Sequence, residues 1–263
     1  MTQTRGATAT PTYAPGIPMW VDLTAKDLAN TVRFYEQLFG WKGEDQGEEF
    51  GHYTLMRYDG KTAAAITPPM DPNAPTAWST YIATSSAAET AKKVDAAGGK
   101  TLMAPFQVGD QGSMAVFMDP AGAVFCVWQA EKMNGAEIVN QPVSFSWNEL
   151  ETRDINASKT FYNKVFGWEP KSNPMPGGGE YVEFLLNGKS TAGGQEMGSN
   201  FPPNVPPHWL VYFTVHNTDD TIKRAQELGG KVMAPAMDIP QGRMAVLTDP
   251  QGAAFAIIQM PPR

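Results

Sequence analysis

Two acidic residues follow a tryptophan by two positions in stretches typical of strands. Asp22 follows Trp20 in WVDL, and Glu149 follows Trp147 in WNEL. Because side chains alternate along a strand, each acid shares a face with its tryptophan. A carboxylate in an aromatic, apolar cavity has a raised pKa and can act as a general acid or base. Asp22 and Glu149 are therefore the candidate catalytic residues; accepting hydrogen bonds from a loop or helix, or facing solvent, is the alternative role for both.

Further aromatic residues recur at matching positions in the two halves of the chain. Trp78 matches Trp209, and Tyr81 matches Tyr212. Aromatic walls suit a flat, largely apolar ligand, and core packing is the alternative role for such residues. We expect one of each pair of aromatics to pack in the core and the other to line the cavity. Arg243 could meet an anionic ligand or lie at a solvated strand end. The candidate substrate-binding residues are Trp20, Trp78, Trp147, Trp209, Tyr212 and Arg243.

These residues belong to a unit that is written twice. WVDLTAKDLANTVRFYEQLFGW at 20–41 returns as WNELETRDINASKTFYNKVFGW at 147–168, an offset of 147 − 20 = 127 residues. MAVFMDPAGAVF at 114–125 returns as MAVLTDPQGAAF at 244–255, an offset of 244 − 114 = 130 residues. A repeat of this length predicts two tandem domains. We place a disordered lead at 1–15, the first domain at 16–130, a linker at 131–141 and the second domain at 142–263.

Each half is predicted to contain two βαβββ modules, which gives an α+β fold class. Asp27 is the expected N-cap of the first helix and Gly40 its end. Helices are expected at 28–39, 87–97, 156–166 and 219–228. Strands are expected at 17–23, 52–58, 62–67, 78–84, 101–106, 113–118 and 124–128, and then at 143–150, 181–186, 191–195, 209–215, 231–235, 243–248 and 254–259.

The composition indicates a globular protein with no nucleic-acid or membrane partner. Of the 263 residues, 42% are hydrophobic, and the net charge of −7 opposes binding to nucleic acid or anionic membranes. No apolar run reaches the ~20 residues of a transmembrane helix. The N-terminus lacks the apolar stretch of a secretory signal. The single cysteine, Cys126, cannot form an intrachain disulfide, which fits a cytoplasmic location.

The order of several motifs resembles the vicinal oxygen chelate superfamily. The first helix of each half ends in FY…FGW, the second is followed by GG-K, and DP-x-G precedes the last strand. The superfamily includes glyoxalase I, extradiol dioxygenases, fosfomycin-resistance enzymes and bleomycin-binding proteins, and the resemblance covers 17–130 and 143–260. The two-domain layout is similar to an actinobacterial group of glyoxalase-like proteins and hydroxylases. The resemblance implies that each pair of modules curls into a half-open, mixed-sheet barrel with a ligand in its concavity.

The resemblance also implies three metal-ligand positions in each domain, where the family places His or Glu. Tryptophan, leucine and alanine cannot ligate a metal, and a lone cysteine makes no site. We therefore expect no metal and no other cofactor. His208 lies near the second position, although a loop or capping role is the commoner one. The implied positions are Trp20, Ser79 and Cys126 in the first half, and Trp147, Leu210 and Ala256 in the second.

Three functions remain open on this sequence. The first is a metal-independent enzyme of secondary metabolism or detoxification that uses Glu149 or Asp22 on a small aromatic or polyketide-like molecule. The second is a non-catalytic drug-binding protein of the bleomycin-resistance type, and the third a metal-dependent glyoxalase, lyase or dioxygenase. Only the second half has Glu149, Glu183, Arg243 and a glycine-rich loop at 176–180, a possible lid, so we expect its cavity to work. Because two domains can pair within one chain, we expect a monomer, with a homodimer as the alternative.

Overall fold

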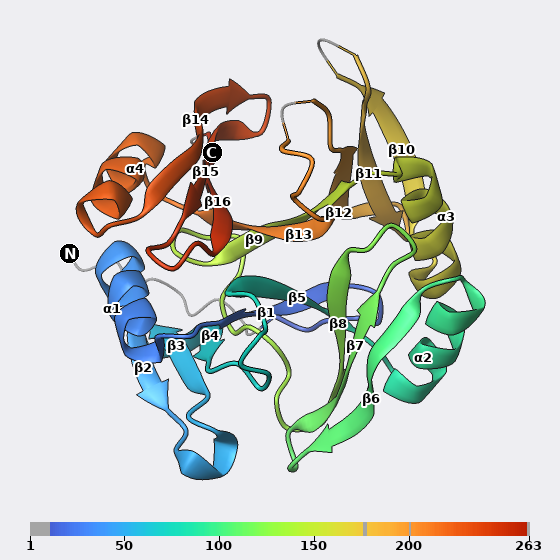
Figure 1. Ribbon diagram of the computed structural model, residues 1–263, viewed down its shortest axis with the longest axis horizontal. Helices are drawn as coiled ribbons and strands as arrows, with labels where there is room; N and C mark the ends of the chain where they lie inside the picture. The colour runs from blue at the N-terminus through green and yellow to red at the C-terminus, as the bar shows by residue number, and fades with distance from the viewer. Residues whose placement is uncertain (1–10, 176–177, 200, 262–263) are drawn as a thin grey trace, which may run out of the picture.

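The structure is a computed structural model that describes residues 11–175, 178–199 and 201–261. It contains two eight-stranded mixed sheets, ordered β2-β3-β4-β1-β5-β8-β7-β6 and β10-β11-β12-β9-β13-β16-β15-β14. Each sheet curves into a half-open barrel, and the two barrels open away from one another (Figure 1). In the described part of the chain, no helix is long and apolar enough to cross a membrane.

The first sheet is built from two modules of identical topology. The first comprises β1 (Pro18–Thr24), α1 (Leu28–Phe39), β2 (Lys42–Asp45), β3 (Thr54–Tyr58) and β4 (Lys61–Thr67), with a short 3₁₀ helix at Glu48–Phe50. The second comprises β5 (Ala77–Ala83), α2 (Ala87–Ala96), β6 (Lys100–Val108), β7 (Gly112–Met118) and β8 (Val124–Ala130). The first and last strands of each module pair in parallel, and β1 joins the modules by pairing antiparallel with β5.

The second sheet repeats this plan. Its first module comprises β9 (Phe145–Thr152), α3 (Ile155–Phe166), β10 (Glu169–Pro174), β11 (Glu180–Leu186) and β12 (Lys189–Glu196). Its second comprises β13 (His208–Thr214), α4 (Thr218–Glu227), β14 (Lys231–Ile239), β15 (Gly242–Thr248) and β16 (Ala254–Gln259). The α+β class and the doubled modules predicted from the sequence are confirmed.

Local signals in the sequence set the ends of the first helix of each domain. The Asp27 side chain accepts a hydrogen bond from the amide of Asn30, and Gly40 ends α1 at φ 72°. Asp154 and Gly167 repeat the arrangement around α3, where the glycine has φ 73°. A carboxylate at the N-cap satisfies a free helix amide, and glycine takes the left-handed conformation without a Cβ clash.

The two short edge strands β2 and β10 are absent from the strands predicted from the sequence. Their sequences, KGED and EPKSNP, are almost entirely exposed. Apolar and polar residues do not alternate in these strands, because neither face of either strand is covered. As edge strands of the described sheets, β2 pairs with β3 and β10 pairs with β11. The module count was inferred correctly from the repeat, but these strands give no hydrophobic signal of their own.

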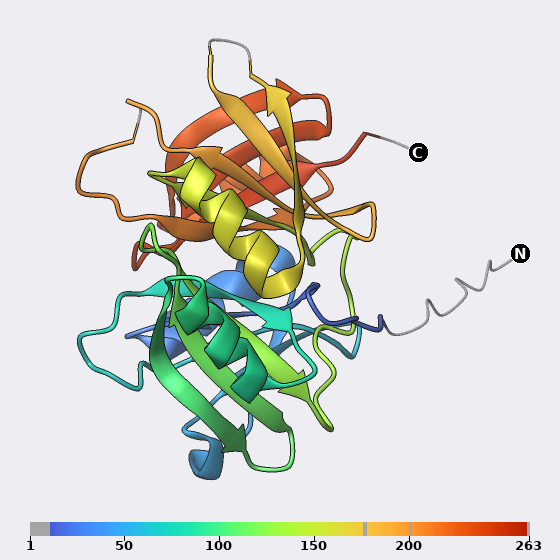
Figure 2. The same ribbon diagram turned by 90° about the vertical axis from the view of Figure 1, so that its right-hand side faces the viewer.

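The domains pack through their helices and the convex faces of their sheets. Helix α1 contacts α4, and α2 contacts α3, which Figure 2 shows one above the other. Across this interface Thr80 donates a hydrogen bond to the buried Asn148 side chain at 2.8 Å. The Tyr162 hydroxyl donates to the Asp119 carboxylate at 3.2 Å and accepts one from the indole N–H of Trp209 at 3.1 Å. One chain thus forms the paired arrangement within itself.

Candidate functional site

The floor of the second barrel is formed by alternate residues of β9. Trp147, Glu149 and Glu151 share the concave side, because the intervening residues pack into the core. The indole N–H of Trp147 donates to the Tyr181 hydroxyl at 2.9 Å. The Tyr212 hydroxyl donates to Oε1 of Glu149 at 2.7 Å. Glu149, only 5% exposed, therefore lies between aromatic residues of β9, β11 and β13.

A second carboxylate lies beside the first. Glu151 is 2% exposed, and its Oε1 accepts a hydrogen bond from the side-chain amide of Gln195 at 2.9 Å. Its Oε2 is buried, and none of the residues that the structure describes donates a hydrogen bond to it. Burial raises the pKa of Glu149, against the opposing effect of hydrogen bonds from Tyr212 and Tyr181. Burial and the neighbouring Glu149 charge together raise the pKa of Glu151 well above its usual value.

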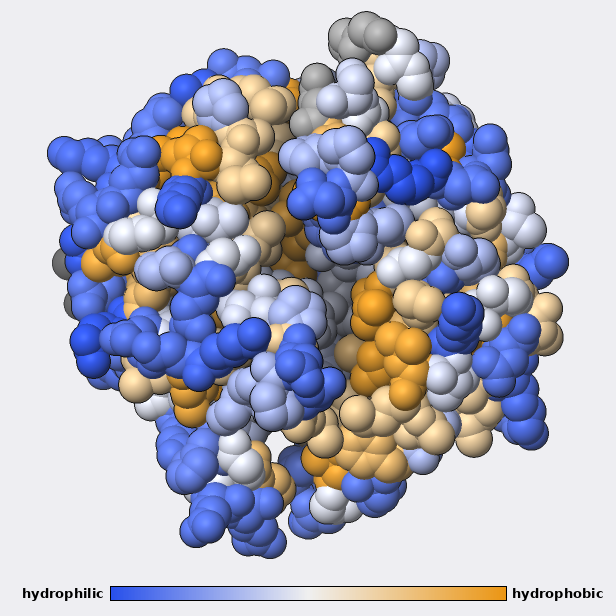
Figure 3. All heavy atoms as spheres, in the orientation of Figure 1, coloured by the Kyte–Doolittle hydropathy of each residue, from blue (hydrophilic) through white to orange (hydrophobic). Residues whose placement is uncertain are grey.

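The walls above this floor differ in chemistry. One wall, from β13, β15 and β16, is apolar and includes Leu210, Met244 and Ile258. The other wall carries Glu183, which forms an ion pair with Lys171 at 2.9 Å. Figure 3 shows a hollow in the upper half of the molecule, with hydrophobic side chains inside it. A concave face of this kind suits a ligand with one apolar face and one polar edge. We call it the second concave face, and it consists of Trp147, Glu149, Glu151, Tyr181, Glu183, Gly193, Gln195, Leu210, Tyr212, Met244 and Ile258.

The absence of a side chain at Gly193 leaves space for the side chains of Tyr181 and Trp147 on this face. It lies opposite Glu149 on the neighbouring strand β12. A Cβ at this position would lie 2.0 Å from the Tyr181 hydroxyl and 2.7 Å from the Trp147 indole nitrogen. A side chain here would therefore displace Tyr181. Ala65 occupies the corresponding position opposite Asp22 in the first domain.

The first domain contains the same network around a single acid. Asp22 accepts hydrogen bonds from the hydroxyls of Tyr81 at 2.8 Å and Tyr53 at 3.2 Å. The Trp20 indole N–H donates to the Tyr53 hydroxyl at 2.9 Å. Burial raises the pKa of Asp22 to about 6, although the tyrosine hydrogen bonds oppose the shift. Thr24 stands where the second domain has Glu151, so the first network lacks a second carboxylate.

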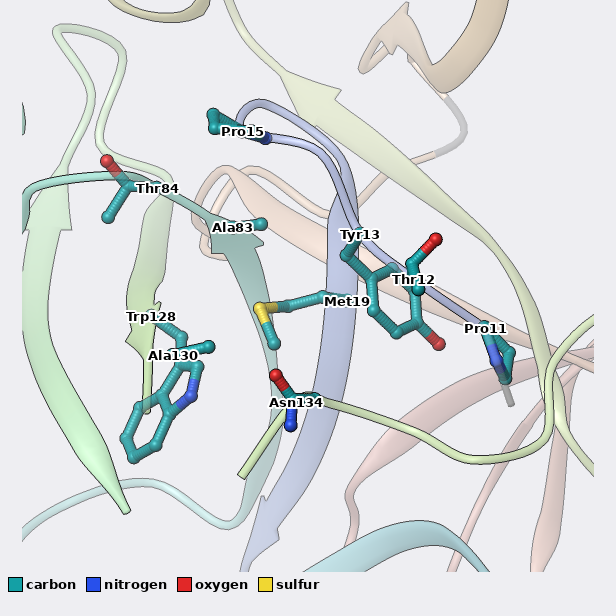
Figure 4. Close-up of a pocket in the computed structure, with 10 residues that line it drawn as sticks. All are labelled: Pro11, Thr12, Tyr13, Pro15, Met19, Ala83, Thr84, Trp128, Ala130 and Asn134. Atoms are coloured by element: carbon teal, nitrogen blue, oxygen red, sulfur yellow. The ribbon is translucent and has the colours of Figure 1, made fainter. Parts of the chain in front are cut away.

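The first concave face (Trp20, Asp22, Tyr53, Tyr81 and Cys126) is covered by other parts of the chain. The segment at 131–141 crosses one end of the barrel, where the amide of Ala136 donates to the carbonyl of Met19. The Tyr13 hydroxyl donates to the Ala136 carbonyl at 2.7 Å. A cavity of about 200 Å³ remains beneath the segment at 11–15, beside Met19 and Trp128 (Figure 4). Trp20 is only 2% exposed, whereas Trp147 is half-buried, so the second face is the more accessible.

The structure places three candidate ligand contacts outside both concave faces. Trp78 and Trp209 face the interdomain core, where Trp78 donates to the Tyr35 hydroxyl at 3.0 Å. Arg243 shares the convex side of β15 with the core residues Ala245 and Leu247, and it pairs there with Asp219 at 3.0 Å. None of these three residues therefore lies on the concave faces where the sequence analysis expected a ligand. In each matched pair of aromatic residues, the tyrosine (Tyr81 or Tyr212) lies on a concave face and the tryptophan (Trp78 or Trp209) packs in the core.

The residues that the sequence analysis missed are Tyr53, Tyr181 and Glu151. Tyr53 and Tyr181 are 181 − 53 = 128 residues apart, between the two repeat offsets of 127 and 130, so the repeat would have identified them as a matched pair. Glu151 follows Glu149 by two positions, so strand alternation alone places it on the same face. The loop at 176–180, which the sequence analysis considered as a lid, falls partly outside the described residues, because 176 and 177 are not described.

Fold and site together define a class of protein. Two tandem domains, each of paired βαβββ modules whose sheet curves around a concave face, form the vicinal oxygen chelate fold. A family model described as Glyoxalase/Bleomycin resistance protein/Dioxygenase superfamily matches residues 18–127 and 144–257. The chain belongs to this superfamily.

Curated relatives match nearly the whole chain. The anthracycline biosynthesis protein DnrV of Streptomyces peucetius is 40% identical over 265 residues, 94% of each chain. The putative glyoxylase CFP32 of Mycobacterium tuberculosis is 38% identical over 258 residues, 95% of this chain and 97% of the relative.

Solved structures of lower identity share the fold. The Mn(II)-bound glyoxalase from Novosphingobium aromaticivorans has a TM-score of 0.64 at 16% identity and covers 94% of this chain and 83% of its own. The 2,2',3-trihydroxybiphenyl 1,2-dioxygenase from Sphingomonas wittichii has a TM-score of 0.65 at 13% identity, with coverage of 94% and 91%.

The residues at the metal positions that the resemblance implies do not fit a divalent ion. Trp147, Leu210 and Ala256 offer no donor atom, and in the first domain Cys126 is buried with a raised thiol pKa. In the described ranges, no group of three or more His, Cys, Asp or Glu side chains is placed to hold a metal. His208, near the second position, lies opposite Glu151 in the strand pairing and holds its Nδ1 2.9 Å from the Pro206 carbonyl oxygen.

Proposed function

We propose that this protein is a metal-independent enzyme that moves a proton on a small aromatic or polyketide-like molecule, in secondary metabolism or detoxification. The observation that carries the proposal is Glu149, a buried carboxylate with a raised pKa on an accessible, aromatic concave face. Such a carboxylate is a stronger base than one in water and can exchange protons near neutral pH. The relatives named for anthracycline biosynthesis support a fused-ring aromatic ligand class.

The arrangement of the face supports a specific division of roles. The apolar wall around Leu210 and Met244 would hold the flat face of a fused ring, and Trp147 would contact its edge. Glu149 would take a proton from a carbon next to a ring carbonyl, because the dry floor leaves its charge poorly hydrated. The Tyr212 hydroxyl would hold the carboxylate in place through its 2.7 Å hydrogen bond.

The test uses anthrone, a tricyclic ketone with an acidic ring methylene, in deuterated buffer without oxygen. We expect the protein to accelerate deuterium incorporation at that methylene. Glu149→Gln should lower this rate about 100-fold or more, the scale of general acid–base catalysis, and leave affinity by tryptophan quenching nearly unchanged. Glu169→Gln, on the exposed edge strand β10, is the matched control. A Glu149→Gln variant that exchanges as fast as wild type would exclude Glu149 as the base.

The same experiment separates catalysis from sequestration. A drug-binding protein of the bleomycin-resistance type would quench on adding anthrone but would not accelerate exchange. Asp22→Asn addresses which domain works. Because Asp22 lies beneath the covered first face, we expect this variant to retain exchange.

A further inference from the structure

The two acids on β9 form a carboxylate pair. Glu149 and Glu151 are two positions apart on one strand, so their side chains point to the same side. Both are at least nine-tenths buried, and the charge of Glu149 raises the pKa of Glu151. Two ionised carboxylates this close, without a counterion, would repel strongly in a dry site.

The hydrogen bonds around the pair show where a proton belongs. Glu149 accepts from the Tyr212 hydroxyl, and Oε1 of Glu151 accepts from Gln195. Oε2 of Glu151 is buried, and no group of the described residues donates a hydrogen bond to it. A buried carboxylate oxygen without a donor is costly, whereas a carboxyl O–H beside Glu149 can itself donate. Protonation of Glu151 at Oε2 therefore satisfies both residues.

We propose that Glu149 and Glu151 share one proton, held on Glu151, and together form a proton-shuttling dyad with a single negative charge. The groups that face the pair from the strands packed beside it are Tyr181, Glu183, Gln195, Tyr212 and His208. Burial lowers the pKa of His208, so this residue is neutral above pH 7, and none of these groups supplies a fixed positive charge.

The dyad suits the transfer of a proton between two positions of one ligand, an extension that rests on the proposed function. Glu149 takes a proton from a ring carbon, and the electron pair of the broken C–H bond moves into the ring to give an enolate. Glu151 gives its proton to the enolate oxygen. The proton now on Glu149 then passes to Glu151 along their shared hydrogen bond, which restores the starting state. One proton leaves the ligand and one returns, so the product is a tautomer and no co-reactant is consumed.

The protonation state is testable without any ligand. At pH 8, Glu151→Gln should leave the electrophoretic mobility of the native protein unchanged, because a neutral group replaces a neutral group. Asp22→Asn should remove one negative charge, because the pKa of Asp22 is about 6. Infrared difference spectra at the same pH should show a protonated-carboxyl C=O band in wild type that Glu151→Gln lacks and Asp22→Asn retains. A Glu151→Gln mobility change equal to that of Asp22→Asn, with no such band in wild type, would overturn the dyad.

The activity measurement separates the dyad from the proposed function. With anthrone, Glu151→Gln should slow the anthrone–anthrol interconversion at least 10-fold, while deuterium exchange through Glu149 falls less. If the infrared band is present but no variant alters exchange, the dyad stands and the proposed function fails. If exchange depends on Glu149 but the band is missing, the proposed function stands and the dyad fails.

Discussion

Replacing Asp22 by asparagine should change how the stability of the protein depends on pH. Burial raises the pKa of this carboxyl from 3.8 to about 6. Below pH 3.8 the group is protonated in both the folded and unfolded states and costs nothing. As the pH rises towards 6, the unfolded state ionises first, so the free energy of unfolding falls. At about 1.4 kcal/mol for each pH unit, the full loss is about 3 kcal/mol above pH 6.

The amide oxygen of asparagine can accept both tyrosine hydrogen bonds without carrying a charge. Asp22→Asn should therefore be more stable than wild type by up to about 3 kcal/mol at pH 7 and nearly equal at pH 3.5. Urea unfolding followed by tryptophan fluorescence between pH 3.5 and 8 measures the difference between the two curves. Glu169→Gln on the exposed strand β10 is the control and should follow wild type throughout.

The decisive quantity is the pH dependence of that difference. A constant difference between pH 3.5 and 8 would refute the argument, because it would show that Asp22 titrates equally in the folded and unfolded states. A variant that is less stable at every pH would show that the amide disrupts the bonds to Tyr53 and Tyr81.

Three further expectations follow from the site and the interface. Gly193→Ala should lower deuterium exchange at least 10-fold, because the new methyl displaces the Tyr181 hydroxyl, whereas Ala65→Gly in the first domain should not; equal rates in both variants would contradict this account. Tyr162→Phe should cost about 1–3 kcal/mol in urea unfolding, because the indole N–H of Trp209 loses its acceptor, with ligand affinity preserved. Elemental analysis after dialysis against zinc, nickel, iron and manganese should find no stoichiometric metal, and a 1:1 ion would restore glyoxalase or dioxygenase chemistry.

The sequence predicted the fold well because the repeat carries information that single elements lack. Asp27 and Gly40 mark a helix by local chemistry, and the repeat shows the same marks again at α3. Strands β2 and β10 were missed because their residues are solvated and follow no hydrophobic period.

The candidate site was predicted only in part. Strand alternation correctly placed Trp20 with Asp22 and Trp147 with Glu149 on common faces. The side of the sheet that Trp209 faces could not be read from its type, since both faces of this sheet are aromatic. That choice depends on the pairing of β13 with β9, a contact between segments about 60 residues apart.

The linker between the two domains makes their two concave faces differ in accessibility. Two separate copies of a single domain could pair with perfect symmetry and present two identical cavities. Joining the copies requires a link, and this link and the N-terminal segment lie across the first barrel. The duplicated unit is thereby divided into one domain whose concave face is covered and one whose concave face is accessible. We expect such a chain to take up one ligand molecule, with a simple hyperbolic isotherm and no cooperativity between its halves.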